Sequence, residues 1–186
     1  MGFTRQELES FRDHTIPDLI DERTKLLFVG INPGLWTAAT QTHFCHPSNR
    51  FYPALKRAGL IDFDIDTDHG MTREQRFDFT SRGMGISNLV QRATVRASEL
   101  TSDELRAGAE RLRLLVNTIR PLVVAVAGVT AYRTAFGVNS AVMGRQELDG
   151  PAEWWVLPNP SGLNAHVQVD DLAEWFRTVA VRAGIL

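Results

Sequence analysis

The chain has 186 residues, of which 44% are hydrophobic and 23% are charged. A chain of this size and composition buries enough apolar surface for one globular domain, so we expect a single domain over residues 1–186. The formal net charge of −2 excludes a strongly basic protein that coats nucleic acid, although a focused contact with DNA stays open. The single cysteine, Cys45, excludes a disulfide framework and a paired-cysteine metal site.

The N-terminal segment begins Met1-Gly2-Phe3-Thr4-Arg5. It lacks the basic flank and apolar run of a signal peptide, and no apolar stretch approaches the length that spans a bilayer. We therefore expect a cytoplasmic protein with no membrane partner.

Four short apolar runs predict strands. Residues 26–29 form the first run, and residues 85–90 form a less regular second run that starts at the second of two nearby glycines, Gly83 and Gly85. Residues 121–128 and 154–157 form the third and fourth. Continuous apolar runs of this length are typical of strands that are buried on both faces.

Helical patterns lie between and after the later strands. Thr101-x-x-Glu104 resembles a capping box, and apolar residues then recur at helical spacing up to Pro121. Asp170 and Asp171 are expected to cap a last helix. The apolar face of that helix would consist of Leu172, Trp175, Phe176 and Val179.

Buried strands that alternate with amphipathic helices predict an α/β fold, a three-layer sandwich with a short, mostly parallel central sheet. In such sheets ligands bind outside the carboxyl ends of the strands. The loops that follow Val29, Asn88 and Leu157 are therefore the places where we expect chemistry.

The turn Gly30-Ile31-Asn32-Pro33-Gly34-Leu35 follows the first predicted strand. Glycine and proline fix a backbone path there that brings a ligand close to main-chain N–H groups and to the Asn32 amide. The alternative is an ordinary turn that ends a strand, since these residue types are common in turns.

The loop Leu157-Pro158-Asn159-Pro160-Ser161-Gly162-Leu163-Asn164 presents a leucine among residues that form neither strand nor helix. An exposed leucine on a stiff loop is typical of a wedge that unstacks a duplex. The alternative is a proline-rich loop with Leu163 packed inward.

Four segments, in this order, resemble the mismatch-specific uracil-DNA glycosylase and thymine-DNA glycosylase family. Residues 30–35 resemble the first family motif, and residues 159–164 resemble the second. Residues 44–52, Phe-Cys-His-Pro-Ser-Asn-Arg-Phe-Tyr, resemble the segment that stacks on an extruded base, and residues 85–94 resemble a further family block. The resemblance runs from Leu26 to the last helix and implies a uracil-DNA glycosylase-like sandwich.

The resemblance implies base excision repair of DNA. In that activity uracil opposite guanine is flipped out of the duplex, and water attacks its N-glycosidic bond. Asn32 would position the water, while main-chain N–H groups near Ile31 and Asn32 stabilise charge on the departing base. Phe44 would stack on the base, a contact that contributes about 1–3 kcal/mol.

The second motif would act on the space that the base leaves. The resemblance implies that a wedge and two main-chain contacts to the orphaned guanine come from Leu163, Gly162 and Asn164. Relatives commonly carry an arginine where this chain has Ala165. His166 is then a candidate to replace that phosphate contact, and Ser161 is a candidate for a pocket or phosphate contact.

The first and second motifs also bear on the rate of base excision. Stronger uracil glycosylases carry an aspartate and a histidine where this chain has Asn32 and Asn159. Asparagine has no titratable group and cannot take a proton from water. The resemblance therefore implies slow turnover and tolerance of other damaged pyrimidines, such as etheno-cytosine.

Four further residues are candidates for the pocket. Asn88 would hydrogen-bond the pyrimidine edge, or alternatively cap the end of a strand. The Thr37 methyl group would restrict thymine, so thymine excision is expected to be weak or absent. His43 and His46 either line the pocket or have structural roles.

No segment predicts a metal or cofactor. The run Asp62-x-Asp64-x-Asp66-x-Asp68 lacks, in either register, the central glycine and terminal acidic ligand of a calcium loop. The histidines lack metal-ligand spacing, and no nucleotide-binding glycine motif occurs. We expect a solvated acidic loop here and no cofactor.

No lysine stands at a motif position where an amine nucleophile would be needed, so the leading hypothesis is a monofunctional DNA glycosylase that uses water. We expect a monomer that acts on double-stranded DNA containing G·U mismatches. One alternative is a non-catalytic module that binds mismatched or abasic DNA through Leu163. Another is an α/β protein that binds a small nucleobase or nucleotide, which leaves Leu163 unexplained.

Overall fold

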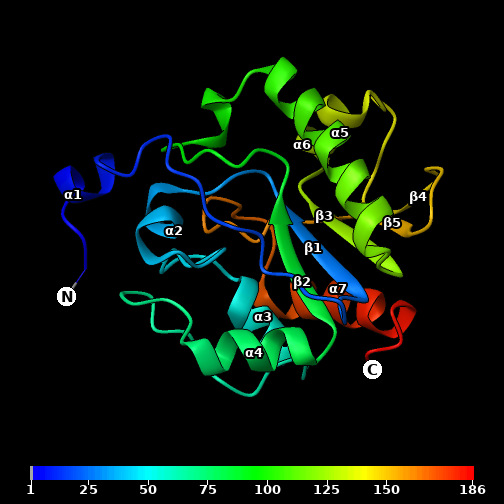
Figure 1. Ribbon diagram of the computed structural model, residues 1–186, viewed down its shortest axis with the longest axis horizontal. Helices are drawn as coiled ribbons and strands as arrows, with labels where there is room; N and C mark the ends of the chain where they lie inside the picture. The colour runs from blue at the N-terminus through cyan, green and yellow to red at the C-terminus, as the bar shows by residue number, and fades with distance from the viewer. Residues whose placement is uncertain (1) are drawn as a thin grey trace.

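The computed structural model describes residues 2–186, and its centre is a five-stranded sheet in the order β2-β1-β3-β5-β4 (Figure 1). Four neighbouring strands are parallel. They are β1 (Leu26–Gly30), β2 (Met84–Asn88), β3 (Val123–Ala127) and β5 (Glu153–Leu157). The predicted mostly parallel sheet is confirmed. The edge strand β4 (Gly144–Gln146), antiparallel to β5, was not predicted because its three residues carry no apolar pattern.

The helices are α1 (Arg5–Glu9), α2 (Leu35–Thr40), α3 (Phe51–Arg57), α4 (Arg73–Ser81), α5 (Ser102–Ile119), α6 (Val129–Phe136) and α7 (Val169–Arg182), with a 3-10 turn η1 (Ala97–Glu99). Helices α5 and α6 cover one face of the sheet, and α3, α4 and α7 cover the other (Figure 1). None of the helices in residues 2–186 combines the length and the apolar character needed to cross a bilayer. Short helices such as α2 and α3 escaped prediction because six or seven residues are too few to show an apolar period.

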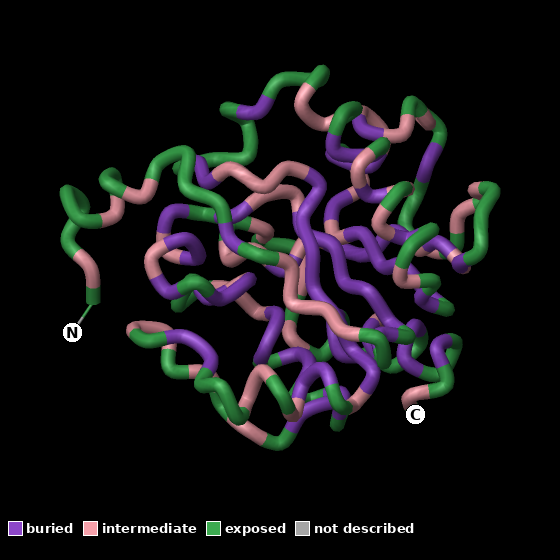
Figure 2. The backbone as a smooth tube through the Cα atoms, viewed as in Figure 1, coloured by how far each residue is buried: buried purple, intermediate pink, exposed green. Residues whose placement is uncertain are grey.

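Alternate residues of the strands enter two separate cores, one on each face of the sheet. Leu27 and Val29 of β1 pack with residues of α5 and α6. Leu26 and Phe28 point the other way and pack with residues of α3, α4 and α7. The central strand β1 and its neighbour β2 are buried along their whole length (Figure 2). The expected three-layer α/β sandwich is confirmed by this arrangement.

The two predicted helix caps have different outcomes. At α5 the hydroxyl of Thr101 accepts a bond from the Glu104 N–H at 3.1 Å, and the Glu104 carboxylate accepts one from the Thr101 N–H at 2.8 Å, which confirms the capping box. At α7 the prediction is wrong in part, because the N-cap is Gln168. The Asp171 carboxylate reaches back to the Gln168 N–H at 2.9 Å, since Asp171 is the third helical residue. Asp170 instead forms an ion pair with Arg57.

The N-terminal segment closes the outer edge of β2. Leu19 and Ile86 exchange two main-chain hydrogen bonds of 2.9 and 2.8 Å. An uncovered edge strand would leave its N–H and C=O groups unpaired. The neighbouring Asp18 accepts a 2.7 Å bond from the Ser87 hydroxyl and pairs with Arg111 of α5. The segment therefore fixes the carboxyl end of β2 as well as its edge.

Helix α5 approaches the chain after β2 most closely at Gly108. A Cβ at position 108 would lie 2.3 Å from the carbonyl oxygen of Leu89, within the main chain that follows Asn88. The absence of a side chain at Gly108 therefore allows α5 to pack at this distance.

We expect Gly108→Ala to lower the free energy of unfolding by about 1–3 kcal/mol, the usual cost of overpacking. The contact is with main chain, which moves less readily than a flexible side chain. The cost of overpacking therefore outweighs the stability gained from the higher helix propensity of alanine, about 1 kcal/mol. Urea denaturation measures the change. Asn117→Ala, at an exposed position of the same helix, is the control and should be close to neutral. Unchanged stability in Gly108→Ala would contradict the close approach.

Candidate functional site

The carboxyl ends of the parallel strands meet at one edge of the sheet, and a cleft of about 690 Å³ opens there. In the strand register Gly30 lies opposite Asn88, and Ala127 lies opposite Leu157. The loops after β1, β2 and β5 all contribute to the cleft walls. The predicted site residues that line it are Ile31, Asn32, Thr37, Phe44, His46, Asn88, Ser161, Gly162, Leu163 and Asn164. His43 and His166 are not among the lining residues.

The Asn32 side chain has a fixed orientation. Its amide nitrogen lies 2.8 Å from the Thr94 hydroxyl, 3.0 Å from the Arg92 carbonyl and 3.1 Å from the Pro33 carbonyl. The Thr94 hydroxyl donates its own hydrogen to the Arg96 carbonyl, so toward Asn32 it can only accept. The Asn32 Oδ1 accepts no hydrogen bond from the described residues. It is therefore available to a water molecule or a ligand in the cleft.

Thr94 is a site residue that sequence reasoning missed. It lies in the family-like segment 85–94, yet its importance comes from a contact with a residue 62 positions away. Thr94 is buried and lines the cleft beside Asn32. No local pattern in the sequence marks such a contact.

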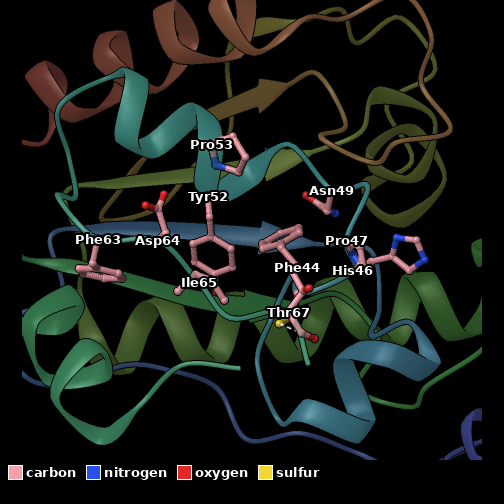
Figure 3. Close-up of a pocket in the computed structure, with 11 residues that line it drawn as sticks. Phe44, His46, Pro47, Asn49, Tyr52, Pro53, Phe63, Asp64, Ile65 and Thr67 are labelled. Carbon is pink, nitrogen blue, oxygen red and sulfur yellow. Dashed lines mark hydrogen bonds between the residues drawn. The ribbon is translucent and has the colours of Figure 1, made fainter. Parts of the chain in front are cut away.

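Phe44, Asn88 and Gly30 meet at the end of β1. A Cβ at position 30 would lie 3.0 Å from the Phe44 ring and 2.5 Å from Asn88 Oδ1, so glycine is required for this approach. Phe44 has a left-handed backbone with φ of 56°, and its ring stacks on Phe51 at a centroid distance of 4.2 Å. Phe44 also lines a smaller cavity of about 120 Å³ on the α3 side (Figure 3). The ring is thus held from behind and contributes to the wall of the main cleft.

His43 determines the orientation of the Asn88 amide. The His43 Nε2 lies 3.0 Å from the Pro17 carbonyl, which can only accept, so Nε2 carries a hydrogen. Burial lowers the pKa of His43 to about 4, against the smaller effects of the Pro17 bond and of the Asp18 charge. The ring is therefore neutral at pH 7, and its bare Nδ1 accepts a bond from Asn88 Nδ2 at 3.1 Å. Asn88 Oδ1 is left as an acceptor at the cleft wall.

Two more groups hold Asn88 from behind. Arg111 donates to the main-chain carbonyl of Asn88 and also donates to the Ser87 hydroxyl at 3.1 Å. Asp18 accepts from the same hydroxyl. The ring of His43 is buried behind Asn88 and does not line the cleft. Of the two alternatives for His43, this position corresponds to the structural role.

The loop of residues 159–164, here called the tip loop, is tied together by its own hydrogen bonds. The Asn159 side chain accepts from the Ser161 N–H at 3.0 Å, and the Asn159 carbonyl accepts from the Asn164 side chain at 3.1 Å. The Ser161 hydroxyl accepts from the Leu163 N–H at 3.3 Å. Leu163 is 90% exposed, so the alternative of an inward-packed leucine is excluded.

The remaining predicted residues have varied positions. Thr37 is buried at 6% exposure and lines the cleft. Burial lowers the pKa of His46, whose Nδ1 accepts from the Ser48 N–H at 3.2 Å. His166 is exposed beyond the tip loop. Among residues 2–186 no cluster of three or more His, Cys, Asp or Glu side chains is arranged to hold a metal ion.

Fold and cleft together define an α/β sandwich with its ligand site at the carboxyl edge of a parallel sheet. Residues 17–182 match the family model of the uracil DNA glycosylase superfamily. Because the match includes the sheet and the cleft, the chain belongs to the uracil DNA glycosylase superfamily.

A solved structure shares the fold. The chain is similar to a Methanosarcina acetivorans protein, provisionally named a uracil DNA glycosylase and solved by solution NMR, with a TM-score of 0.60. The match covers 93% of this chain and 98% of that chain at 18% sequence identity. The likeness concerns the fold, and it confirms the expected uracil-DNA glycosylase-like sandwich.

The neutral state of His43 predicts that stability depends on pH. In the unfolded chain this histidine binds a proton with a pKa near 6.5, and in the folded chain only near 4. The contribution of neutral His43 is complete above pH 6.5 and is lost as pH falls toward 4, by up to about 3 kcal/mol.

Urea unfolding at several pH values measures this dependence. His43→Gln should reduce it, since glutamine can donate to Pro17 and accept from Asn88 without titrating. His14→Gln, at an exposed position, should keep the wild-type profile. Identical profiles for His43→Gln and the wild type would show that the buried ring is not the cause.

Proposed function

We propose that the protein is a monofunctional DNA glycosylase that excises uracil, preferentially opposite guanine, after rotating the base into the cleft. The observation that carries this proposal is that Asn32 Oδ1, which accepts no hydrogen bond within residues 2–186, and the exposed Leu163 belong to the same cleft. One is suited to orient a water molecule, and the other to fill the space of a rotated base. Membership of the uracil DNA glycosylase superfamily supports the same activity.

The rotated base would be read by Asn88 and stacked on Phe44. Asn88 Oδ1 is an acceptor, which matches the N3–H of uracil, whereas N3 of cytosine is itself an acceptor. Thr37 lines the cleft, and in this proposal its methyl group disfavours the extra methyl of thymine, so thymine is at most a weak substrate. The size of the cleft leaves room for larger damaged pyrimidines such as etheno-cytosine.

Bond cleavage in this proposal depends on orientation and not on a strong base. Asn32 holds the water by its Oδ1, and main-chain N–H groups of the turn at Ile31 and Asn32 stabilise the departing base. Among the described residues that line the cleft there is no lysine, aspartate or glutamate. Water is therefore the nucleophile, and turnover is slow.

The preference for a guanine partner follows from two features. A mismatched base costs less to rotate out of the stack than a paired one. In the proposal, Leu163 then enters the space, and the main chain of Gly162 and Asn164 contacts the orphaned guanine. Such an enzyme engages one base at a time and acts as a monomer.

The second candidate is a module that binds mismatched or abasic DNA without cleaving it. The absence of a carboxylate among the described lining residues favours it, because Asn32, the residue suited to orient the water, cannot accept a proton from it. The cleft and Leu163 would then serve only to hold a rotated nucleotide or an abasic gap.

We expect the protein to release uracil from a labelled duplex with one U·G pair, detected as strand scission after alkali. Asn32→Ala should lower the single-turnover rate by about 10²–10³-fold, because it removes the group that orients the water. Affinity for the duplex should change little. Asn117→Ala on the far part of α5 is the control and should cleave as the wild type does.

The same assay separates the two candidates. No abasic product at stoichiometric protein would exclude the glycosylase. Tight binding of duplex with an abasic site would then support the binding module, and its loss in Leu163→Ala would identify the contact.

We expect Leu163→Ala to slow uracil release from duplex DNA by about tenfold or more, since a buried leucine contributes roughly 1.5–3 kcal/mol. Release from single-stranded DNA should stay within about twofold of the wild type, because no stack has to be opened there. Single-turnover rates on the two substrates give the ratio. A loss of equal size on both would contradict the wedge.

A further inference from the structure

Arg50 braces the tip loop from the start of α3. One terminal nitrogen of its guanidinium donates to the Ser161 carbonyl at 3.2 Å and to the Asn164 carbonyl at 3.0 Å. The Arg50 main-chain N–H donates to the Pro160 carbonyl at 2.9 Å. Three carbonyls of the tip loop are thus held by one residue that is more than 100 positions away in the chain.

The two guanidinium bonds flank Leu163. Ser161 precedes the leucine by two residues and Asn164 follows it directly, so the bonds fix both ends of the short segment that carries the leucine. A planar guanidinium can hold two carbonyls in a defined geometry, whereas a lysine ammonium is a single point charge on a flexible stem. The arrangement therefore depends on arginine and not only on positive charge.

A second contact presses the tip loop against the same segment. A Cβ at Gly162 would lie 2.3 Å from the Ser48 hydroxyl and 2.6 Å from the Ser48 carbonyl. The Ser48 N–H is itself bound to His46. The segment of residues 46–50 thus forms the support on which the tip loop rests.

The arginine at the other end of α3, Arg57, provides a contrast. Arg57 forms an ion pair with Asp170, and both side chains are largely exposed. Among residues 2–186 no carboxylate forms an ion pair with Arg50, whose side chain donates hydrogen bonds to the two carbonyls. The Arg50 side chain therefore serves the tip loop, while that of Arg57 joins two helix ends.

We propose that Arg50 is a positioning residue for Leu163, holding the tip loop in the shape that lets the leucine enter a base stack. This inference rests on the proposed function, because it concerns the wedge of that same site. The physical basis is preorganisation: a loop already ordered in the free protein loses little conformational entropy on binding. Arg50 acts through Leu163 and not on the base or the water.

Arg50→Lys tests the proposal, because it keeps the charge and removes the two-carbonyl geometry. We expect its rate of uracil release from a U·G duplex to fall about tenfold, the effect of losing charged hydrogen bonds. Release from single-stranded DNA should stay within about twofold, and Arg57→Lys should match the wild type on both substrates. A parallel loss on both substrates, with a lower unfolding midpoint, would mean a general role in folding and would overturn the proposal.

The double variant tests whether Arg50 acts through the leucine. In a Leu163→Ala background, Arg50→Lys should cause no further loss on the duplex, since residues that act as a unit are non-additive. A further loss of about tenfold in that background would overturn the proposal, because it would show a role independent of Leu163.

A readout without cleavage keeps this inference separate from the proposed function. The probe is a duplex with 2-aminopurine next to a stable abasic analogue opposite guanine, whose fluorescence rises on unstacking. The wild type should raise the fluorescence, and Arg50→Lys and Leu163→Ala should both reduce the rise. That pattern without any uracil release would sink the proposed function and support the role of Arg50. Uracil release by the wild type, together with an undiminished fluorescence rise in Arg50→Lys, would support the proposed function and overturn the role of Arg50. If the wild type caused no fluorescence rise, the role of Arg50 would also be overturned.

Discussion

The shared carboxyl edge of the parallel strands is the constraint on which the site depends. Both faces of the sheet are buried under helices, so polar groups can gather only where the strands end. The register brings Gly30 level with Asn88, and the missing side chain of Gly30 lets the Asn88 amide and the Phe44 ring meet there. Turns from three strands then close around one cleft.

The oriented amides of Asn32 and Asn88 distinguish this cleft, whose described lining residues include no carboxylate. Three acceptors surround the amide nitrogen of Asn32, and the amide nitrogen of Asn88 donates to a neutral histidine. Within residues 2–186 the oxygen of each amide is therefore left without a hydrogen-bond donor. Oriented dipoles of this kind need no reorganisation during a reaction and bind a polar ligand in one pose. In the proposed reaction, a site built in this way would hold a base and a water molecule in register, and proton transfer would be slow.

Much of the fold could be predicted because its strands and longer helices depend on local patterns in the sequence. Apolar runs located the parallel strands, and the Thr101–Glu104 spacing located the start of α5. β4 and the short helices α2 and α3 were not predicted, since a few residues cannot display a period. Asp170 was predicted to cap α7, but the N-cap is Gln168, because the capping position depends on where the backbone becomes helical.

The sequence alone determined the sandwich, the turn at Asn32 and the loop at Leu163, because glycine, proline and apolar spacing act on neighbours a few residues away. Only the tertiary structure decided how these parts are held. Thr94 reaches Asn32 across 62 positions, His43 reaches Asn88 across 45, and Arg50 reaches Ser161 across 111. Contacts over such separations leave no local pattern, since they form only when distant segments pack at the same edge of the sheet.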